Sequence, residues 1–586
     1  MKFRDGVERS AVALRERMEA LLPSAKAAEK EAWISWLLDF EDLRARLSHL
    51  ASYLSCLNAA EANNTTAAKE EAHLQEIAAS AEVCAEALIQ GLGQLDEAAF
   101  DAILAEERLK GAAFILRELR ERAFRRMDLA RESLAAGLSV HGLKAWSRLY
   151  ARLSSQITFT VTDRSGDTRS VPMAQRSHWL SLPERAVRKS AFENSNAAWT
   201  AQETVCEAAL NAVAGTRHLL NQRRGVEHFL DNACVDARIS CGTLEAMFAA
   251  IAEEGPRLRD AARFRFALMG MEAGAYYDLS APAAPASGLA LGWSDGCALV
   301  SQSFHDSYPA LGEFFDDLCR DRWIDHSPRP HKRPGGFCST SLLSRESRIF
   351  MTYEEDLGAV LTLAHEVGHA WHGRLLGDMR PFAAGYPMTL AESASTFAEM
   401  ILIKGILDNR ELPPAVHREL ADLDLRRSII FLLELPARFH FEKRFHEERA
   451  KGYVPANRLR EIMVEAEQAC FGDALAEDGV APLFWASKQH FYLSGVHFYN
   501  FPYTFGFLLS RALFDRFEAE GPAYLNTFER FLRESGSRHG DDLLRDYIGG
   551  EPADPSFWVE PIRGISSIVE RMRSNASSRE VTQPSS

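Results

Sequence analysis

Length, composition and charge exclude several classes of protein before any motif is considered. With 586 residues, 46% of them hydrophobic and 25% charged, the chain can bury more than one core, and no stretch approaches the roughly 18 consecutive apolar residues of a membrane helix. The net charge of −15 repels phosphate backbones and anionic lipid, so we expect neither nucleic acid nor membrane as a partner.

The N-terminus and the cysteines indicate a reducing compartment. Residues 1–18 mix charged with apolar side chains and lack the apolar segment and cleavage site of a secretory signal. The nine cysteines are scattered without Cys-x-x-Cys pairs, which predicts reduced and mostly buried thiols. We therefore expect a cytoplasmic protein.

The first 150 residues are predicted to form amphipathic helices. Segments such as WISWLLDFEDLRARLSHLASYL (33–54) have apolar residues at spacings of three and four. Turn signals at 63–66 and 91–94 divide the region into an up-and-down array. Residues 156–172 instead alternate apolar with polar side chains around a Ser-Gly-Asp turn, which predicts a short β-hairpin.

The rest of the chain is predicted to be helical with one further extended region. Helical spacing returns over 183–275, and an Ala- and Pro-rich stretch at 280–288 indicates a loop or linker. Two runs of β-forming residues follow at 335–340 and 348–353. We expect a mostly α protein with small β insertions, divided into an N-terminal helical lobe (1–190), a catalytic lobe (191–570) and a disordered tail (571–586).

The segment VLTLAHEVGHAWHG (360–373) predicts a catalytic metal site on a buried helix. His365 and His369 are four residues apart, so they share one face and can bind one ion. Glu366 lies about 100° around the helix, where it can take a proton from a water in the open coordination position. Zinc suits neutral imidazoles, acidifies a bound water and polarises a carbonyl. We therefore predict a zinc-dependent hydrolase with Glu366 as its general base.

The third zinc ligand is expected in TLAESASTFAEM (389–400). Glu392 follows His365 by 27 residues, across a Gly- and Pro-containing connection that allows the chain to fold back. Small residues around Glu392 would allow a close approach. Glu399 lies two helical turns further on and is expected to hydrogen-bond a ligating imidazole. His365, His369 and Glu392 are thus predicted to hold one zinc ion per chain.

Packing and solvent exposure are the alternatives to these roles. A His-Glu pair inside an apolar helix is costly to desolvate without a partner, which favours ligation for the helix motif. Glu392 and Glu399 have a solvated helix face as their alternative. His372 does not fit the metzincin pattern, which has Gly at that position and His three residues later, so we expect it to pack or to meet solvent.

Taken together, the motifs resemble a known family. TLAHEVGHAWHG, AESASTFAEM, GGFCSTS, ESRIFMTY and the downstream HFYLSGVHFYNFPYTFGFLLS are similar, in order and spacing, to the oligoendopeptidase F branch of the thimet oligopeptidase family. The resemblance implies a two-lobed, clam-like helical metallopeptidase fold with a deep cleft, and cleavage of internal bonds in short unstructured peptides. The family's zinc ligands fall on His365, His369 and Glu392, and its base falls on Glu366.

The resemblance also implies residues that stabilise the transition state. These fall on His490, Tyr499 and Tyr503, and phenol and imidazole groups are suitable donors to a tetrahedral oxyanion. His497 is an alternative to His490. Simple aromatic packing is the alternative for each tyrosine.

Substrate binding and reaction type leave further alternatives open. The strands at 335–340 and 348–353 could pair with an extended peptide or could simply cover the cleft. A zinc carboxypeptidase or dipeptidase on a similar helical fold would use the same ligands. A catalytically silent peptide-binding protein would be expected to lose the base or a ligand, whereas all four residues are present.

Overall fold

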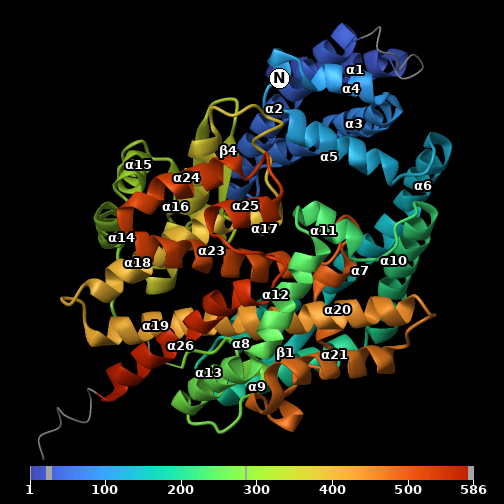
Figure 1. The fold of residues 1–586 in the computed structure, drawn as a ribbon. Helices are drawn as coiled ribbons and strands as arrows, with labels where there is room; N and C mark the ends of the chain where they lie inside the picture. The colour runs from blue at the N-terminus through green and yellow to red at the C-terminus, as the bar shows by residue number, and fades with distance from the viewer. Residues whose placement is uncertain (1, 22–29, 284–286, 578–586) are drawn as a thin grey trace, which may run out of the picture. The chain divides into compact units, whose positions relative to one another are not determined.

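The computed structural model describes residues 2–21, 30–283 and 287–577 and is mostly helical (Figure 1). Its packing separates two compact units, each built from three chain segments. The first unit comprises Met1–Arg126, Ala290–Asn409 and Leu513–Gly549, and the second comprises Met127–Leu289, Arg410–Ala512 and Gly550–Ser586. These interleaved units are a different division from the lobes 1–190 and 191–570, which stay a prediction.

The first unit combines an N-terminal helical array with the elements around the predicted metal motif. Its N-terminal core centres on Trp33 and Trp36 of the second helix, which are fully buried against apolar side chains of the first and third helices. The helices of the unit are α1 (Lys2–Leu21), α2 (Lys30–Ala60), α3 (Thr65–Gln94), α4 (Glu97–Leu104), α5 (Ala113–Phe124), α14 (Trp293–Ser307), α15 (Pro309–Arg320), α16 (Leu357–Leu376), α17 (Met388–Ala391), α18 (Ser393–Asp408), α24 (Leu525–Glu534) and α25 (Gly540–Tyr547).

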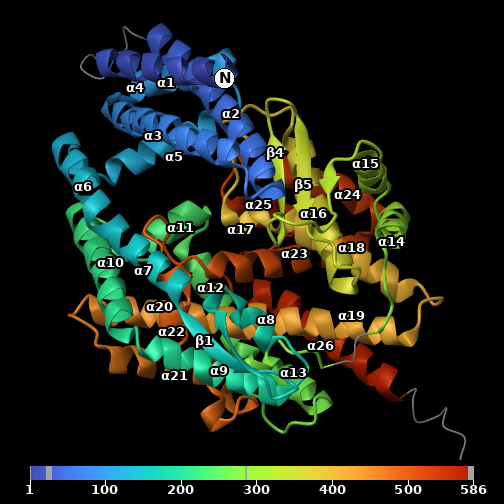
Figure 2. The same cartoon turned by 180° about the vertical axis from the view of Figure 1, so that it is seen from behind.

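A three-stranded sheet in the first unit lies beside α16 (Figure 2). It consists of β3 (Ile324–Asp325), β4 (Gly336–Ser341) and β5 (Glu346–Met351) in the order β3-β5-β4. β4 and β5 are antiparallel, with Cys338 opposite Ile349, and they occupy the two runs of β-forming residues in the sequence. The two-residue strand β3, parallel to β5, was not predicted, because so short a segment has no recognisable alternation.

The second unit is a helical assembly with one hairpin. Strands β1 (Thr158–Thr162) and β2 (Thr168–Pro172) are antiparallel, in the segment where the sequence predicts a hairpin. A π-helical turn, Ile430–Glu434, joins α19 to α20. The helices are α6 (Leu129–His141), α7 (Leu143–Gln156), α8 (Arg176–Leu180), α9 (Arg185–Thr200), α10 (Glu203–Arg223), α11 (Asp231–Ala237), α12 (Cys241–Glu253), α13 (Gly255–Leu268), α19 (Pro414–Ile429), α20 (Leu435–Arg449), α21 (Ala456–Phe471), α22 (Phe484–Ser487) and α26 (Ser556–Ser577); α23 (Phe501–Glu520) begins in this unit and ends in the first.

One pair of cysteines differs from the expectation that all thiols are reduced. Cys234, in the middle of α11, and Cys241, the first residue of α12, form a disulfide with their Cα atoms 5.7 Å apart. The turn between the two short helices brings them together, which spacing alone did not indicate. The other seven cysteines are free thiols, three of them buried and four partly buried.

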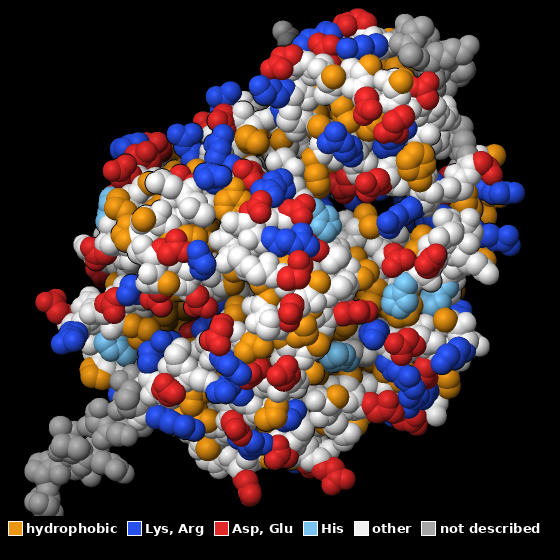
Figure 3. Space-filling model, viewed as in Figure 1, with side chains coloured by type: hydrophobic (Ala, Val, Ile, Leu, Met, Phe, Trp, Pro, Cys, Tyr) orange, Lys and Arg blue, Asp and Glu red, His pale blue; other side chains and the backbone are white. Residues whose placement is uncertain are grey.

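Helix α26 continues to Ser577, so the tail predicted over 571–586 overlaps the end of a helix, and residues 578–586 lie outside the described part of the chain. On the face shown in Figure 3, acidic and basic side chains are interspersed. No helix in the described ranges combines the length and apolar character that a membrane crossing requires.

Candidate metal centre

Helix α16 carries the HEVGH motif and is fixed at its start by a side-chain cap. The Asp356 carboxylate accepts a hydrogen bond from the Ala359 backbone N–H at 2.7 Å, satisfying one of the free donors of the first turn. Leu363, Ala364 and Val367 are fully buried. The helix packs against the sheet on one side and α18 on another, so the motif lies on a rigid element.

Two imidazoles and one carboxylate converge on a single point. The Nε2 atoms of His365 and His369 lie 3.2 Å apart, and Oε2 of Glu392 lies 3.3 Å from the first and 3.5 Å from the second. Among the described residues, these three form the one group of three or more His, Cys, Asp and Glu side chains that could hold a metal ion. The residues predicted as ligands from their spacing are therefore brought together in space.

The two glutamates of the second motif occupy different positions. Glu392 lies at the junction between α17 and α18, where Ser395 Oγ donates a hydrogen bond to its Oε2 at 2.8 Å. Glu392 follows the four-residue helix α17 directly and precedes α18, so it belongs to neither helix. Glu399, on α18, is buried and lies 2.5 Å from Nδ1 of His365. A proton on that nitrogen leaves Nε2 free for a metal.

Glu366 is a buried carboxylate beside this cluster. Its side chain is 6% exposed, and Oε2 has no hydrogen-bond partner. Burial raises the pKa of Glu366 to about 7; the nearby His365 lowers it, and the charge of Glu392 raises it. A carboxylate with a pKa near neutrality and a free oxygen suits a group that accepts and returns a proton.

The donor set fits zinc. Burial, together with the nearby His365, lowers the pKa of His369 to about 4, so the imidazole is neutral and can ligate a cation. Two neutral imidazoles and one carboxylate are a ligand set of catalytic zinc sites, which keep one position open.

Gly368 is a site residue that the sequence reasoning missed. A Cβ at this position would lie 2.5 Å from the Ala394 carbonyl oxygen and from Ser395 Cα, so only glycine allows α16 to lie this close to α18. A glycine inside an otherwise apolar helix was the available signal.

His372 is buried and plays a packing role. Its Nε2 lies 3.1 Å from the Leu532 carbonyl oxygen and 2.9 Å from Ser535 Oγ, and its ring stacks on Tyr386. Burial lowers the pKa of His372 to about 3. Of the two outcomes expected from the sequence, packing is the one observed.

The residues predicted to stabilise the transition state belong to the second unit and form a cluster there. The Tyr503 hydroxyl donates to the Tyr499 hydroxyl at 2.8 Å, and the His490 ring centre lies 4.4 Å from that of Tyr499. His490 Nδ1 lies 2.8 Å from Oδ1 of Asn500. His497 lies near Arg217 and Arg224: burial, followed by the positive charges of these two arginines, lowers the pKa of His497 to about 3. The roles of these residues stay predictions.

Comparison with known proteins identifies the family. Residues 301–561 match the model of peptidase family M3, and residues 92–159 match the model described as oligopeptidase F. The chain belongs to the oligoendopeptidase F branch of peptidase family M3. The M3 match contains the whole metal cluster as well as His490, Tyr499 and Tyr503. The chain is thus a metallopeptidase by family.

Individual relatives are distant in sequence and close in fold. The chain is 22% identical to oligopeptidase PepF of Bacillus subtilis, over 80% of this chain and 69% of the relative. It is 23% identical to an oligoendopeptidase F homolog of Borreliella burgdorferi, over 65% and 64%. The crystal structure of oligoendopeptidase-F from Enterococcus faecium superposes with a TM-score of 0.72 at 16% identity, covering 98% of this chain and 100% of that one. The chain therefore shares its fold with solved oligoendopeptidase F structures, and it is mostly α-helical, as predicted.

Proposed function

We propose that the chain is a zinc-dependent oligoendopeptidase that cleaves internal bonds of short, unstructured peptides. The observation that carries the proposal is the convergence of His365, His369 and Glu392 beside the buried side chain of Glu366, whose Oε2 has no hydrogen-bond partner. His365, His369 and Glu392 would hold one zinc ion. When bound, zinc supplies an acidified water and a Lewis acid for the substrate carbonyl. Relatives named as oligopeptidases and oligoendopeptidases support the substrate class.

Glu366 is assigned the proton transfers. Its free Oε2 takes a proton from the attacking water, and the same oxygen later gives that proton to the leaving amine nitrogen. Burial favours this cycle, because the carboxyl can exist in both protonation states near neutral pH. Glu399 keeps the His365 ring in one orientation throughout.

His490, Tyr499 and Tyr503 are assigned to the charge that develops on the scissile carbonyl oxygen. The hydrogen-bonded pair of tyrosine hydroxyls offers O–H donors, and the contact with Asn500 orients the His490 imidazole. We assign the histidine role to His490 rather than His497, because His490 is the one that contacts Tyr499.

Strand β4 is assigned to binding of the peptide backbone. It is an edge strand, paired with β5 on one side only among the described strands, so its other edge can add an extended peptide as a further strand. Its first residue, Gly336, lies against Glu366: a Cβ there would be 3.3 Å from Oε1. Recognition through main-chain hydrogen bonds favours broad sequence preference.

Digestion of a mixed peptide pool, read by mass spectrometry, tests this function. Wild-type protein is compared with Glu366→Gln, each with and without a chelator and with zinc restored. We expect cleavage at internal bonds of short peptides, lost with the chelator, regained with zinc and absent from Glu366→Gln. Cleavage insensitive to the chelator would refute zinc dependence. A parallel pool with blocked C-termini separates the alternatives, because a carboxypeptidase would not cleave it.

A further inference from the structure

The segment between Tyr492 and α23 has no regular structure, although it carries one of the proposed catalytic tyrosines. Residues 493–498 belong to no helix, strand or hydrogen-bonded turn. Backbone groups left in this way need side chains or solvent as partners. The conformation of this loop, residues 493–500, therefore depends on contacts from neighbouring helices.

Arg217, on α10, supplies two of those contacts. Its guanidinium Nη2 donates to the Leu493 carbonyl oxygen and, at 2.6 Å, to the Val496 carbonyl oxygen. The side chain is 5% exposed. A planar, permanently charged group holding two carbonyls three residues apart fixes the bend between them.

Glu442, on α20, supplies a third contact at the next bend. Its Oε1 accepts a hydrogen bond from the Phe498 backbone N–H at 3.3 Å. Phe498 has φ 50°, a left-handed conformation that is strained for a bulky residue. The strained residue directly precedes Tyr499, and strain of this kind persists only where the surroundings enforce it.

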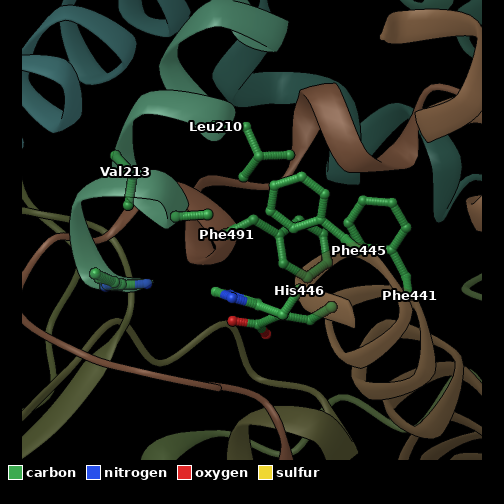
Figure 4. Close-up of a pocket in the computed structure, with 9 residues that line it drawn as sticks. Leu210, Val213, Phe441, Phe445, His446 and Phe491 are labelled. Atoms are coloured by element: carbon green, nitrogen blue, oxygen red, sulfur yellow. The ribbon is translucent and has the colours of Figure 1, made fainter. Parts of the chain in front are cut away.

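The surroundings of these two anchors are apolar. Figure 4 shows Leu210 and Val213 of α10 facing Phe441 and Phe445 of α20, with Phe491 and His446 between them; Arg217 and Glu442 line the same cavity. The Phe498 ring packs on Phe229, Phe439 and His446. Burying the Arg217 guanidinium and the Glu442 carboxyl in these surroundings is costly. The attraction between the two groups, and their hydrogen bonds to the loop backbone, offset that cost.

We propose that Arg217 is a positioning residue of the peptidase, which holds the 493–500 loop so that Tyr499 and the first turn of α23 with Tyr503 keep a fixed place. Arg217 does not itself meet the substrate in this proposal. Its effect reaches the reaction through the backbone at 493 and 496. The inference rests on the proposed function, in which these tyrosines stabilise the transition state.

Variants of Arg217 test the proposal through activity. Arg217→Leu removes both hydrogen bonds, and Arg217→Lys keeps the charge without the planar fork. We expect kcat to fall on the order of 100-fold in Arg217→Leu and less in Arg217→Lys, with smaller changes in KM, because misplaced donors weaken the transition state more than the bound substrate. Zinc content should equal that of wild type. If Arg217→Leu does not fold, Arg217→Lys gives the decisive comparison.

The matched control is Arg265→Lys, another buried arginine of the second unit. Arg265 donates to the carbonyl oxygens of Leu279 and Ala281 and to Asp422 at 2.8 Å, and it has no contact with the loop. This variant should lose stability without the selective fall in kcat. A fall in kcat equal to that of Arg217→Lys would show a general structural effect and overturn the proposal.

A second measurement does not depend on activity. Limited proteolysis by subtilisin, with cuts mapped by mass spectrometry, should proceed about tenfold faster or more within 493–500 in the Arg217 variants than in wild type and Arg265→Lys. Unchanged cleavage of this loop in folded Arg217→Leu or Arg217→Lys would overturn the anchoring role. A wild-type protein without chelator-sensitive peptidase activity would instead sink the proposed function, and the proteolysis result would still decide whether Arg217 holds the loop.

Discussion

Glu366 and Glu392 are both carboxylates of the proposed metal centre, and their replacement should have different consequences. Glu366→Gln should retain zinc and lose nearly all turnover, because the amide cannot accept the proton of the attacking water. Glu392→Ala should lose zinc as well as activity, because it removes a ligand atom. Metal analysis after dialysis and steady-state kinetics measure the two effects. Equal zinc loss in both variants would show that the roles are assigned wrongly.

Tyr503→Phe tests the proposed donor to the oxyanion. We expect kcat to fall on the order of 100-fold with little change in KM, because a hydroxyl aimed at developing charge acts mainly in the transition state. Tyr150→Phe is the matched control: its buried hydroxyl donates to the Ala486 carbonyl oxygen, so its loss should cost about 1 kcal/mol of stability. Wild-type kcat in zinc-loaded Tyr503→Phe would refute the role.

The positions of the proposed ligands were predictable from the sequence to an unequal extent. The i, i+4 spacing of His365 and His369 determines their common face on any helix, and the structure shows their Nε2 atoms 3.2 Å apart. Glu392 lies at a junction between two helices, where it contacts Ser395. The periodicity of the sequence does not show where one helix ends and the next begins. The proposed choice of His490 over His497 depends on a tertiary contact, that of the His490 ring with Tyr499, because both histidines lie in one aromatic-rich stretch.

At the level of elements, the proposed metal site depends on the close approach of α16 to α18 at Gly368. Gly368→Ala should push the helices apart and weaken zinc binding, because the added methyl group meets the backbone at Ala394 and Ser395. Gly358→Ala, on the same helix, is the control: its Cβ would lie 3.4 Å from Asp356 Oδ1, an ordinary contact. Zinc affinity by competition with a chelator dye distinguishes them. Wild-type affinity in Gly368→Ala would refute the constraint.

A buried carboxyl on α21 gives the second unit a pH dependence. Burial raises the pKa of Glu467 to about 8; the Ala481 N–H lowers it, and Glu434 raises it. Because the pKa is higher in the folded than in the unfolded state, its stabilising contribution is complete below the unfolded pKa of about 4.3 and disappears as pH rises through 8.

Glu467→Gln should remove this contribution while leaving an acceptor for the Ala481 N–H. The stability of wild type relative to the variant should therefore decrease between pH 5 and pH 9, as measured by urea unfolding. A difference that is constant across this range would contradict the assignment.

Elements with many repeats of their pattern were predictable, and short ones were not. The helical periodicity before residue 150 corresponds to α1–α7, and the β-forming runs correspond to β4 and β5. Strand β3 has two residues, and its pairing with β5 depends on the tertiary fold. The disulfide between Cys234 and Cys241 likewise depends on how α11 meets α12.

For the whole molecule, the sequence patterns did not predict which segments of the chain make up each compact unit. Each unit gathers three separate segments, and long-range packing rather than composition determines where one unit ends. The metal centre nevertheless draws all of its predicted ligands and its base from one segment, Ala290–Asn409. A local site of this kind can be recognised in the sequence even where the boundaries of the units cannot.

Removal of the metal should lower the stability of the protein, because the metal binds the folded chain. Purified protein should contain one zinc ion per chain, because the described residues offer one cluster of suitable donors. An ion that binds only the folded chain stabilises it by about 2.7 kcal/mol at a free concentration of 100 times its Kd, so a chelator should lower the unfolding temperature and added zinc should restore it. Glu392→Ala is the control, since its unfolding temperature should respond little to either treatment. Active protein with no zinc, or with two tightly bound ions, would contradict a single catalytic site.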